Sequence, residues 1–361
     1  MNNIKIPARP SNKATSFDIA YRAGVSQPTV SRALRGSPMV SEETRRRILA
    51  VARDLNYKVD KNASNLRFQH SNTLALLFFE DPTSDDSLIN PFFLAMLGSI
   101  TRATAMHGYD LLISFQRAAG NEHLDFEESR KADGIILLGY GDYHAARARL
   151  ERLVEQGTRF VRWGQVLDGQ PGISIGCDNF QGARDAAQHL LGLGRRRIAF
   201  LGHASSHYPE FEQRYRGYAE ALAGAGIAAD ARLQVDAITT ERSGYEAARQ
   251  LLARGVAFDG LLGASDLIAI GAMHALREHG LDVPGAVSVV GFDDIPAAAF
   301  GHPPLTTVMQ DTRAAGEVLV ETLLRLVHNE TVTDRLLPAR LVVRKSCGAA
   351  AVPAPPDQRA A

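Results

Sequence analysis

Apolar residues recur along most of the chain in two alternating patterns, short continuous runs and stripes spaced by three or four residues. The runs predict buried strands, and the stripes predict amphipathic helices. The expected strands are Thr73–Phe79, Asp110–Phe115, Gly134–Leu138, Arg159–Trp163, Ile173–Cys177, Arg197–Leu201, Gly260–Ala264 and Val287–Phe292. The helices expected between them include Phe93–Met106, Gln181–Leu191, Gln213–Ala223, Ser243–Ala253 and Leu267–His279. Because strands and helices alternate over roughly 270 residues, the pattern predicts parallel sheets in two doubly wound halves with a cleft between them.

The N-terminal part of the chain, before these strands, has a compact helical pattern of its own. A first helix is expected over Thr15–Ala23, with the hydroxyl of Thr15 or Ser16 as the acceptor at its start. Gly24 permits the positive φ of a tight turn, and Ser26 is placed to cap the next helix. The inward-facing residues of the first two helices are expected to be Ile19, Ala20, Ala23, Val30, Ala33 and Leu34.

The second helix is expected over Gln27–Leu34. Pro28 is tolerated there because the first turn of a helix has no intrahelical donor to lose. A helix in the major groove would present its outer residues to base edges and phosphates, and these are Gln27, Thr29, Ser31 and Arg32. A third helix begins at Ser41 and is expected to bury Ile48, Val51, Ala52 and Leu55. The pattern is that of a helix-turn-helix.

Charge is distributed unevenly although the formal net charge of the chain is zero. Residues 1–67 contain 13 Lys and Arg but only 5 Asp and Glu, which gives +8 for this segment and −8 for the rest. A basic segment joined to an acidic remainder predicts a polyanionic partner such as DNA for the basic part.

Several classes of protein are excluded by what the sequence lacks. Cys177 and Cys347 lie far apart and predict neither a disulfide framework nor a metal site, which fits a reducing cytoplasm. Residues 1–15 have no apolar signal-peptide core, and no run of about 18 apolar residues occurs, so no membrane partner is expected. The chain has no G-x-G-x-x-G, no P-loop and no metal-ligand spacing among its 11 histidines, so no cofactor or metal is expected.

One stretch matches a hydrolase motif literally. Residues Gly172-Ile173-Ser174-Ile175-Gly176 have the G-x-S-x-G form of a nucleophile elbow. That elbow requires its Ser at a turn from strand to helix, whereas Ser174 falls inside a predicted apolar strand. An esterase is therefore disfavoured, and the chain is not expected to be an enzyme.

The helix-turn-helix residues resemble those of the lactose/galactose repressor family. The likeness is carried by Asp18-Ile19-Ala20, Ala23-Gly24-Val25-Ser26 and Thr29-Val30-Ser31-Arg32. In that family the helix matching 26–32 lies in the major groove. Its base-reading positions match Gln27 and Pro28, with Arg32 beside them, and a proline cannot donate a hydrogen bond there. The DNA-contacting residues expected in this domain are Thr15, Ser16, Ser26, Gln27, Pro28, Thr29, Ser31 and Arg32.

A hinge is implied by the same resemblance. Tyr57, Ala63 and Leu66 match positions in a short helix that folds on the operator, where paired leucines from two subunits wedge into the minor groove. The sequence departs from the usual pattern at Val59, where Pro is common, and at Ser64, where Arg or Gln is common. Fewer minor-groove contacts are therefore expected, and an ordinary linker is the alternative.

The resemblance continues through nearly all of residues 73–345. It is carried by Asn90-Pro91-Phe92-Phe93, Asp133-Gly134-Ile135-Ile136, Asp178-Asn179, His189-Leu190, Leu193-Gly194-Arg195-Arg196-Arg197-Ile198, Arg214, Gly217-Tyr218, Ser265-Asp266, Val290-Gly291-Phe292-Asp293-Asp294 and Pro304-Leu305-Thr306-Thr307-Val308. It implies a periplasmic-binding-protein-like α/β sensor of two doubly wound subdomains, whose cleft holds a small-molecule effector, usually a sugar and sometimes a purine. The implied effector-binding residues are Phe92, Phe93, Trp163, Asp178, Arg214, Thr239, Asp266 and Asp293.

Asp266 and Arg214 are expected to hydrogen-bond the effector. Asp266 follows an apolar run at the carboxyl end of a predicted strand, where open α/β sheets bind ligands. A carboxylate accepts from two hydroxyls and a guanidinium donates in a fork, so the pair suits a polyol ring. Alternatively, Asp266 could cap the following helix, Arg214 could lie on the surface and Trp163 could fill a core. At Thr239 relatives often place an aromatic floor, so weaker ring stacking is expected there.

These observations predict a sequence-specific DNA-binding transcriptional regulator, a repressor of a carbohydrate-utilisation operon with a sugar effector. A two-fold operator requires two copies, so a homodimer is expected, and no leucine heptads follow Lys345 to build a coiled coil. The alternatives are a purine-type, corepressor-dependent regulator and a solute-binding protein, which would share the sensor but not the basic helix-turn-helix.

The expected domains follow from these patterns. They are a disordered lead (1–12), a helix-turn-helix domain (13–59), a hinge (60–70), an effector-binding and dimerisation domain (71–346) and a frayed tail (347–361). Within the sensor, the N-terminal subdomain is expected over 71–178 and 312–338, and the C-terminal subdomain over 179–308 and 339–346.

Overall fold

The computed structural model describes residues 14–34, 36–57, 71–79, 89–116, 131–139 and 141–349. The expected lead, the expected hinge with Ala63 and Leu66, and most of the expected tail lie outside these residues. The chain divides into two compact units, Met1–Gln69 and His70–Ala361.

The first unit is a bundle of three helices, α1 (Ser16–Ala23), α2 (Gln27–Leu34) and α3 (Glu42–Asp54). The Thr15 hydroxyl accepts from the Asp18 amide, and the Asp18 carboxylate accepts from the Thr15 amide at 2.7 Å, which makes a capping box at the start of α1. Gly24 ends α1 with φ +64°, as the turn requires. The core consists of Ile19, Ala20, Ala23, Val30, Ala33, Val40, Ile48 and Ala52.

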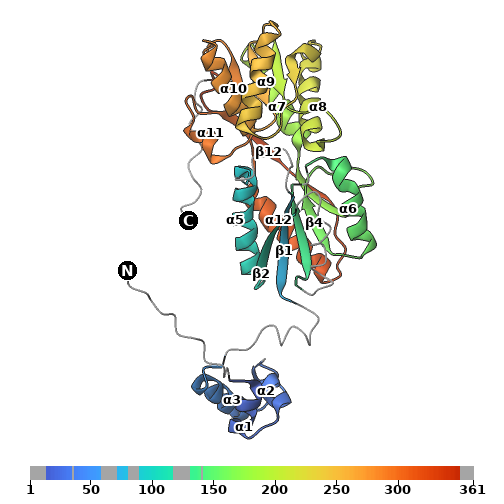
Figure 1. The fold of residues 1–361 in the computed structure, drawn as a ribbon, viewed down its shortest axis with the longest axis vertical. Helices are drawn as coiled ribbons and strands as arrows, with labels where there is room; N and C mark the ends of the chain where they lie inside the picture. The colour runs from blue at the N-terminus through green and yellow to red at the C-terminus, as the bar shows by residue number, and fades with distance from the viewer. Residues whose placement is uncertain are drawn as a thin grey trace, which may run out of the picture. The chain divides into compact units, whose positions relative to one another are not determined.

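The second unit contains two sheets, and the first defines the N-terminal subdomain (Figure 1). Its strands are β1 (Thr73–Phe79), β2 (Asp110–Gln116), β3 (Gly134–Leu138), β4 (Phe160–Trp163), β5 (Ile173–Cys177) and β11 (Arg335–Leu337). They run in the order β11-β5-β4-β3-β1-β2, and every pairing is parallel. The covering helices are α5 (Pro91–Met106), α6 (Tyr143–Glu155) and α12 (Thr312–Val327).

The two faces of this sheet bury alternate residues of its strands. Leu74 and Leu76 of β1 belong to the large core that includes residues of α5 and α12, whereas Ala75 and Leu77 pack in a separate cluster with α6. This alternation is the expected behaviour of a strand that is covered by helices on both sides.

The second sheet defines the C-terminal subdomain. Its strands are β6 (Ile198–Leu201), β7 (Gln234–Val235), β8 (Gly260–Gly263), β9 (Ser288–Asp293), β10 (Thr306–Gln310) and β12 (Ala339–Val342), in the order β12-β10-β9-β8-β6-β7. The helices are α7 (Asn179–Gly192), α8 (Pro209–Gly224), the 3-10 turn η1 (Ala231–Leu233), α9 (Glu241–Ala253), α10 (Asp266–Glu278) and α11 (Pro296–Phe300). The helices α7 and α8 pack against each other, as do α9 and α10 (Figure 1).

The chain passes between the two sheets after β5, after β10 and after β11. The last passage explains the one departure from the predicted parallel sheets. Only Pro338 separates β11 from β12, so β12 enters the second sheet from the side of the first and runs antiparallel to β10. The predicted fold class, a small helical domain followed by a sensor of two doubly wound halves, is confirmed.

Every strand and helix that was predicted within the described residues is present, with ends shifted by a few residues. The sequence prediction did not include β7, β10, β11, β12, α6, α11 or α12. Both thiols, Cys177 and Cys347, are free and buried. Within the part of the chain that the structure covers, no helix combines the length and apolar character needed to cross a bilayer.

Candidate functional site

The outer surface of α2 and the start of α1 form one polar patch on the helix-turn-helix unit. Gln27 Nε2 donates to Ser16 Oγ at 3.3 Å, which links the first turn of each helix. The hydroxyls of Ser26 and Thr29 lie 2.8 Å apart, and Pro28 and Arg32 are exposed. Thr15 is exposed, and Ser31 is half-buried. The side chains predicted to contact DNA in this domain are thus exposed or half-buried, while Val30 and Ala33 of the same helix are buried.

Tyr57, another residue predicted to contact DNA, lies away from the polar patch of α1 and α2. It follows α3, is half-buried and packs against the core of the helical bundle. Its ring therefore stabilises the bundle at the point where the chain leaves it, whatever its contact with DNA.

Substitutions on this unit are expected to separate base reading from phosphate contact. Gln27→Ala and Arg32→Ala should change which bases are preferred, because base edges carry the sequence information. Arg46→Ala removes an exposed side chain of α3 and should weaken binding to all duplexes alike, as expected for a phosphate contact. Selection from randomised half-sites measures the preference, and an unchanged preference with Gln27→Ala would remove Gln27 from the reading surface.

In the sensor unit, Arg214 of α8 lies where the carboxyl ends of several strands meet, and its side chain is 5% exposed. Its Nε donates to Asn179 Oδ1 at 2.8 Å, and Nη1 donates to the carbonyl of Ala264, just after β8. Nη1 also lies 3.5 Å from Asp293 Oδ1. The guanidinium stacks 3.7 Å above the Phe292 ring. Among the described residues, no group accepts from Nη2.

Asp293, the last residue of β9, faces Arg214 with a side chain that is 7% exposed. Gln310 Nε2 donates to Asp293 Oδ1 at 2.6 Å, whereas no described donor reaches Oδ2. Burial raises the pKa of Asp293 to about 6, although Arg214 and the Gln310 hydrogen bond act in the opposite direction. The backbone φ of +114° is unusual for a residue with a side chain, and strain of this kind concentrates at functional sites.

Asp266 bonds to neighbouring segments of the C-terminal subdomain. Its side chain has no exposed surface, and its oxygens accept from the Ile295 amide at 2.8 Å and the Thr307 hydroxyl at 2.5 Å. Each carboxylate oxygen thus accepts one hydrogen bond, and the two bonds connect α10 to the segment after β9 and to β10. The predicted contact of Asp266 with the effector stays a prediction, because a carboxylate oxygen can accept more than one hydrogen bond. Burial, together with the charge of Asp293, raises the pKa of Asp266 well above its ordinary value. The alternative prediction of a helix cap is wrong, because Ser265 caps α10 by accepting from the Ile268 amide.

The predicted aromatic residues gather on the N-terminal subdomain. The rings of Phe92 and Phe93, at the start of α5, lie 5.4 Å apart, and Phe92 lies 6.1 Å from Trp163 at the end of β4. Phe92 and Trp163 are buried, and Phe93 is half-buried. Asp178 caps α7 through the Gln181 amide at 2.9 Å, and Thr239 is half-buried just before α9.

Three polar residues at this site were not among the predicted contacts, namely Gln165, Asn179 and Gln310. Asn179 Nδ2 donates to Gln165 Oε1 at 3.0 Å and so links the Arg214 cluster to the end of β4. Asn179 stood in a recognised motif, and Gln310 follows one, so a signal for both was present. Gln165 lies in a polar stretch without any motif.

Ser174, the candidate nucleophile of the G-x-S-x-G stretch, is the second residue of β5 and has no exposed surface. It lies inside a strand and not at a turn into a helix, so the geometry of a nucleophile elbow is lacking at this position.

Comparison with known proteins agrees with both units. A model of the lacI family of bacterial regulatory proteins matches residues 17–60, and a model of periplasmic binding protein-like domains matches residues 187–347. The regulator GalR of Escherichia coli (strain K12) is 32% identical over 328 residues, which cover 89% of this chain and 91% of GalR. The chain belongs to the LacI family. It is a DNA-binding transcriptional regulator of the helix-turn-helix type, as its sequence predicted.

Other members of the LacI family are similar over nearly the whole chain. An uncharacterised regulator from Streptomyces limosus is 35% identical over 341 residues, covering 91% of this chain and 93% of its own. The lac repressor dimer bound to operator and the anti-inducer ONPF has a TM-score of 0.81 at 29% identity, covering 94% of this chain and all of that one. A complex of the regulator CelR with cellobiose has a TM-score of 0.69 at 30% identity, covering 92% and 99%.

Proposed function

We propose that this LacI-family regulator is a homodimeric repressor of a carbohydrate-utilisation operon, acting in the cytoplasm and controlled by a sugar that binds at Arg214 and Asp293. The observation that carries the proposal is the pairing of a guanidinium and a carboxylate that each keep a group without a partner among the described residues. Nη2 can donate to sugar oxygens and Oδ2 can accept from a hydroxyl, so the pair matches vicinal hydroxyls of a ring.

The surroundings of this pair also suit a sugar. Phe92, Phe93 and Trp163 form an aromatic cluster on the N-terminal subdomain, and apolar faces of sugar rings pack on such side chains. Among similar structures, CelR is bound to cellobiose. A purine is the alternative effector, and its base edge would need a planar partner with both donors and acceptors.

Access to the site requires the two subdomains to separate. The Tyr143 amide, at the start of α6, donates to the His207 carbonyl at 2.8 Å, and His207 Nδ1 lies 2.7 Å from Asp142 Oδ2. His144 Nε2 lies 3.0 Å from Ser206 Oγ. These contacts join the two subdomains directly. Arg214 and Asp293 are almost fully buried in this joined form. An effector that binds only between the subdomains shifts the equilibrium between the separated and joined forms.

The effector is tested by thermal unfolding in the presence of a panel that contains hexoses, cellobiose, lactose, maltose, hypoxanthine and guanine. A ligand at 100 times its Kd stabilises the folded chain by about 2.7 kcal/mol, so a sugar that binds raises the melting temperature by several degrees. A shift with a purine and with no sugar would replace the proposed effector by the alternative one.

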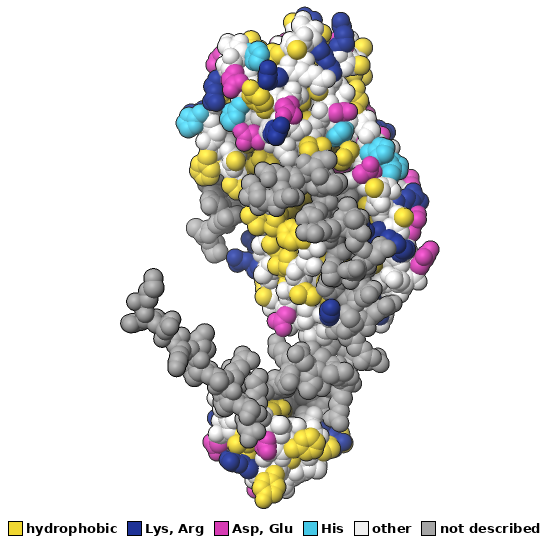
Figure 2. All heavy atoms as spheres, viewed as in Figure 1, with side chains coloured by type: hydrophobic (Ala, Val, Ile, Leu, Met, Phe, Trp, Pro, Cys, Tyr) yellow, Lys and Arg dark blue, Asp and Glu magenta, His cyan; other side chains and the backbone are white. Residues whose placement is uncertain are grey.

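The homodimer is supported by an apolar surface on the N-terminal subdomain. The edge strand β2 and the neighbouring helix α5 expose the side chains of Leu94, Met106, Leu112, Ile113 and Phe115. Figure 2 shows apolar side chains gathered on the surface over α5. Large exposed apolar side chains gathered on one subdomain suit an interaction site, and an operator of two half-sites calls for a second copy of the chain.

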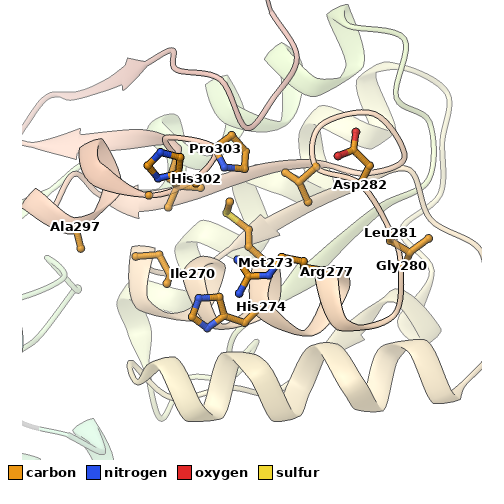
Figure 3. Close-up of a pocket in the computed structure, with 13 residues that line it drawn as sticks. Ile270, Met273, His274, Arg277, Gly280, Leu281, Asp282, Ala297, His302 and Pro303 are labelled. Carbon is orange, nitrogen blue, oxygen red and sulfur yellow. The ribbon is translucent and has the colours of Figure 1, made fainter.

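A second candidate dimer surface lies on the C-terminal subdomain. A pocket of about 550 Å³ lies between α10 and the segment from α11 to β10, with Ile270, Met273 and Arg277 on one side and His302 and Pro303 on the other (Figure 3). Phe300, beside this pocket, is 79% exposed. Because a two-fold interface presents the same surface from both copies, a protruding ring in one copy can fill a pocket in the other.

Ile113→Lys and Phe300→Asp are each expected to weaken the dimer, since each places a charge where an apolar side chain would be covered. Sedimentation of the wild type should give a dimer at micromolar concentration, and each variant should dissociate at a concentration at least tenfold higher. Val154→Lys on α6 is the matched control, because Val154 is 50% exposed against 45% for Ile113. A monomeric wild type, or equal dissociation with Val154→Lys, would contradict the proposed interface.

A further inference from the structure

Four residues around the proposed effector site form a closed circuit of hydrogen bonds. Arg214 Nε donates to Asn179 Oδ1 at 2.8 Å, and Asn179 Nδ2 donates to Gln165 Oε1 at 3.0 Å. The backbone amide of Gln165 donates to Glu210 Oε1 at 2.8 Å. Glu210 lies four residues before Arg214 on α8, so one helical turn closes the circuit.

Only Gln165 in this circuit belongs to the N-terminal subdomain. It follows β4, whereas Asn179, Glu210 and Arg214 belong to α7 and α8 of the C-terminal subdomain. Gln165 is therefore tied to α8 twice, by its side chain through Asn179 and by its backbone through Glu210.

The side chains that form these bonds are buried, which raises the free-energy cost of breaking them. Asn179 is 2% exposed, Gln165 is 8% exposed, and Arg214 is 4% exposed. A buried polar group that loses its partner costs more free energy than the bond itself contributes, because water cannot replace the partner. The circuit therefore favours the state in which all its members meet, which is the state with the two subdomains joined.

We propose that Asn179 and Gln165 are positioning residues that couple the effector-binding guanidinium of Arg214 to the N-terminal subdomain. Asn179 fixes the direction of Arg214 with its carbonyl oxygen and holds the end of β4 with its amide nitrogen. The orientation of Arg214 and the joining of the subdomains thus depend on one side chain. This inference rests on the proposed role of Arg214 in effector binding. The coupling of Arg214 to the N-terminal subdomain through Asn179 and Gln165 is a property of the chain without any sugar.

The test is hydrogen exchange of the full-length chain without added ligand, followed in the peptide that contains the Gln165 amide. Exchange of an amide at equilibrium reports how often its hydrogen bond opens. Gln165→Leu and Asn179→Leu are each expected to speed exchange of this peptide about fivefold, as the loss of one hydrogen bond of about 1 kcal/mol implies. Gln181→Leu is the matched control, since Gln181 lies on the same helix, is exposed and donates from its side chain to Asp185, outside the circuit.

A double variant separates the circuit from general destabilisation. If the two residues act through the same link, Gln165→Leu with Asn179→Leu exchanges no faster than Asn179→Leu alone. Trp163, the one tryptophan of the chain and 6% exposed, gives a second readout, because acrylamide should quench it more in both single variants. Unchanged exchange in Gln165→Leu, or additive effects in the double variant, would overturn the proposal.

The result is independent of the sugar panel. The predicted exchange pattern in a chain that responds to no sugar would leave the coupling intact and overturn the proposed effector. A sugar response together with unchanged exchange would do the reverse. If Asn179→Leu fails to fold, Gln165→Leu still decides the matter. It removes the acceptor of Asn179 and a local bond to the Val166 carbonyl, and it leaves Asn179 bonded to Arg214 and to the Cys177 carbonyl.

Discussion

Asp293→Asn is expected to lower the affinity for the effector sugar by roughly tenfold to a hundredfold, because a hydrogen bond to a charged group contributes about 1.5–3 kcal/mol. The substitution keeps the shape of the side chain and an oxygen that can accept from Gln310, but it removes the charge facing Arg214. Calorimetric titration with the responding sugar of the panel measures the loss. Asp230→Asn, at an exposed carboxylate paired with Arg232 at 2.7 Å, is the matched control and should leave sugar binding unchanged.

The same variant is expected to be more stable than the wild type at neutral pH. The pKa of Asp293 rises from its ordinary value of 3.8 to about 6 because the carboxyl is buried, an effect that Arg214 and Gln310 only partly offset. Between these two values the folded chain keeps a proton that the unfolded chain has lost. Folding stability therefore falls as the pH rises from about 4 to above 6, at a cost on the order of 3 kcal/mol.

Asparagine cannot ionise and escapes this cost. Urea unfolding at pH 5 and pH 7.5 should show the advantage of Asp293→Asn growing with pH. Normal sugar affinity in a folded Asp293→Asn chain would show that the effector binds elsewhere.

Removal of the helix-turn-helix unit is expected to abolish operator binding and leave sugar binding intact. A fragment starting at His70 keeps the first residues of the sensor, where the Ser71 and Asn72 amides donate to the Asp133 carboxylate at 2.5 and 2.9 Å. It loses the whole segment that carries a net charge of +8, residues 1–67. The affinity of the full chain should fall steeply with salt, with a log–log slope of about 0.9 for each neutralised phosphate.

Gel shift and calorimetry on the fragment and the full chain measure both activities. The full chain with the sensor intact is the reference for sugar affinity, and a duplex of unrelated sequence is the reference for operator affinity. Operator binding by the fragment would contradict the assignment of DNA binding to the helix-turn-helix unit and sugar binding to the sensor unit.

The sequence predicted the elements that have strong, regular patterns. Most strands inside the two sheets are continuous apolar runs, since helices cover both faces, and these strands were predicted. The exception is β10, which is buried but begins with two threonines and ends with a glutamine. The helix-turn-helix was equally clear, because its cap, its glycine turn and its buried stripe all indicated the same structure. The edge strands β11 and β12 were missed because they are short and largely exposed, so no apolar run marks them.

The helix α12 was not predicted, although its sequence has a clear helical pattern. The helix α12 buries Ala315, Leu319, Val320 and Leu323, which follow the helical spacing of three and four residues. Its pattern predicts a helix as clearly as that of α10.

The effector site shows where sequence reasoning ends. Asp266 and Asp293 both occur at the carboxyl end of an apolar strand run, and both were predicted contacts. Which of them keeps an unbonded oxygen depends on Ile295, Thr307 and Gln310, whose positions are set by the packing of β9 and β10. Gln165 gave no signal at all, because its role arises only when the two subdomains meet.

The most direct test of the account is a selection of bound duplexes from a random pool by the full-length chain, with and without the responding sugar. We expect enrichment of a site with two related half-sites in two-fold symmetry, and a changed yield of that site when the sugar is present. In Asp293→Asn the same site should be enriched, and the sugar should no longer change the yield. Enrichment of no common site, or a sugar response that persists unaltered in Asp293→Asn, would contradict the proposed function.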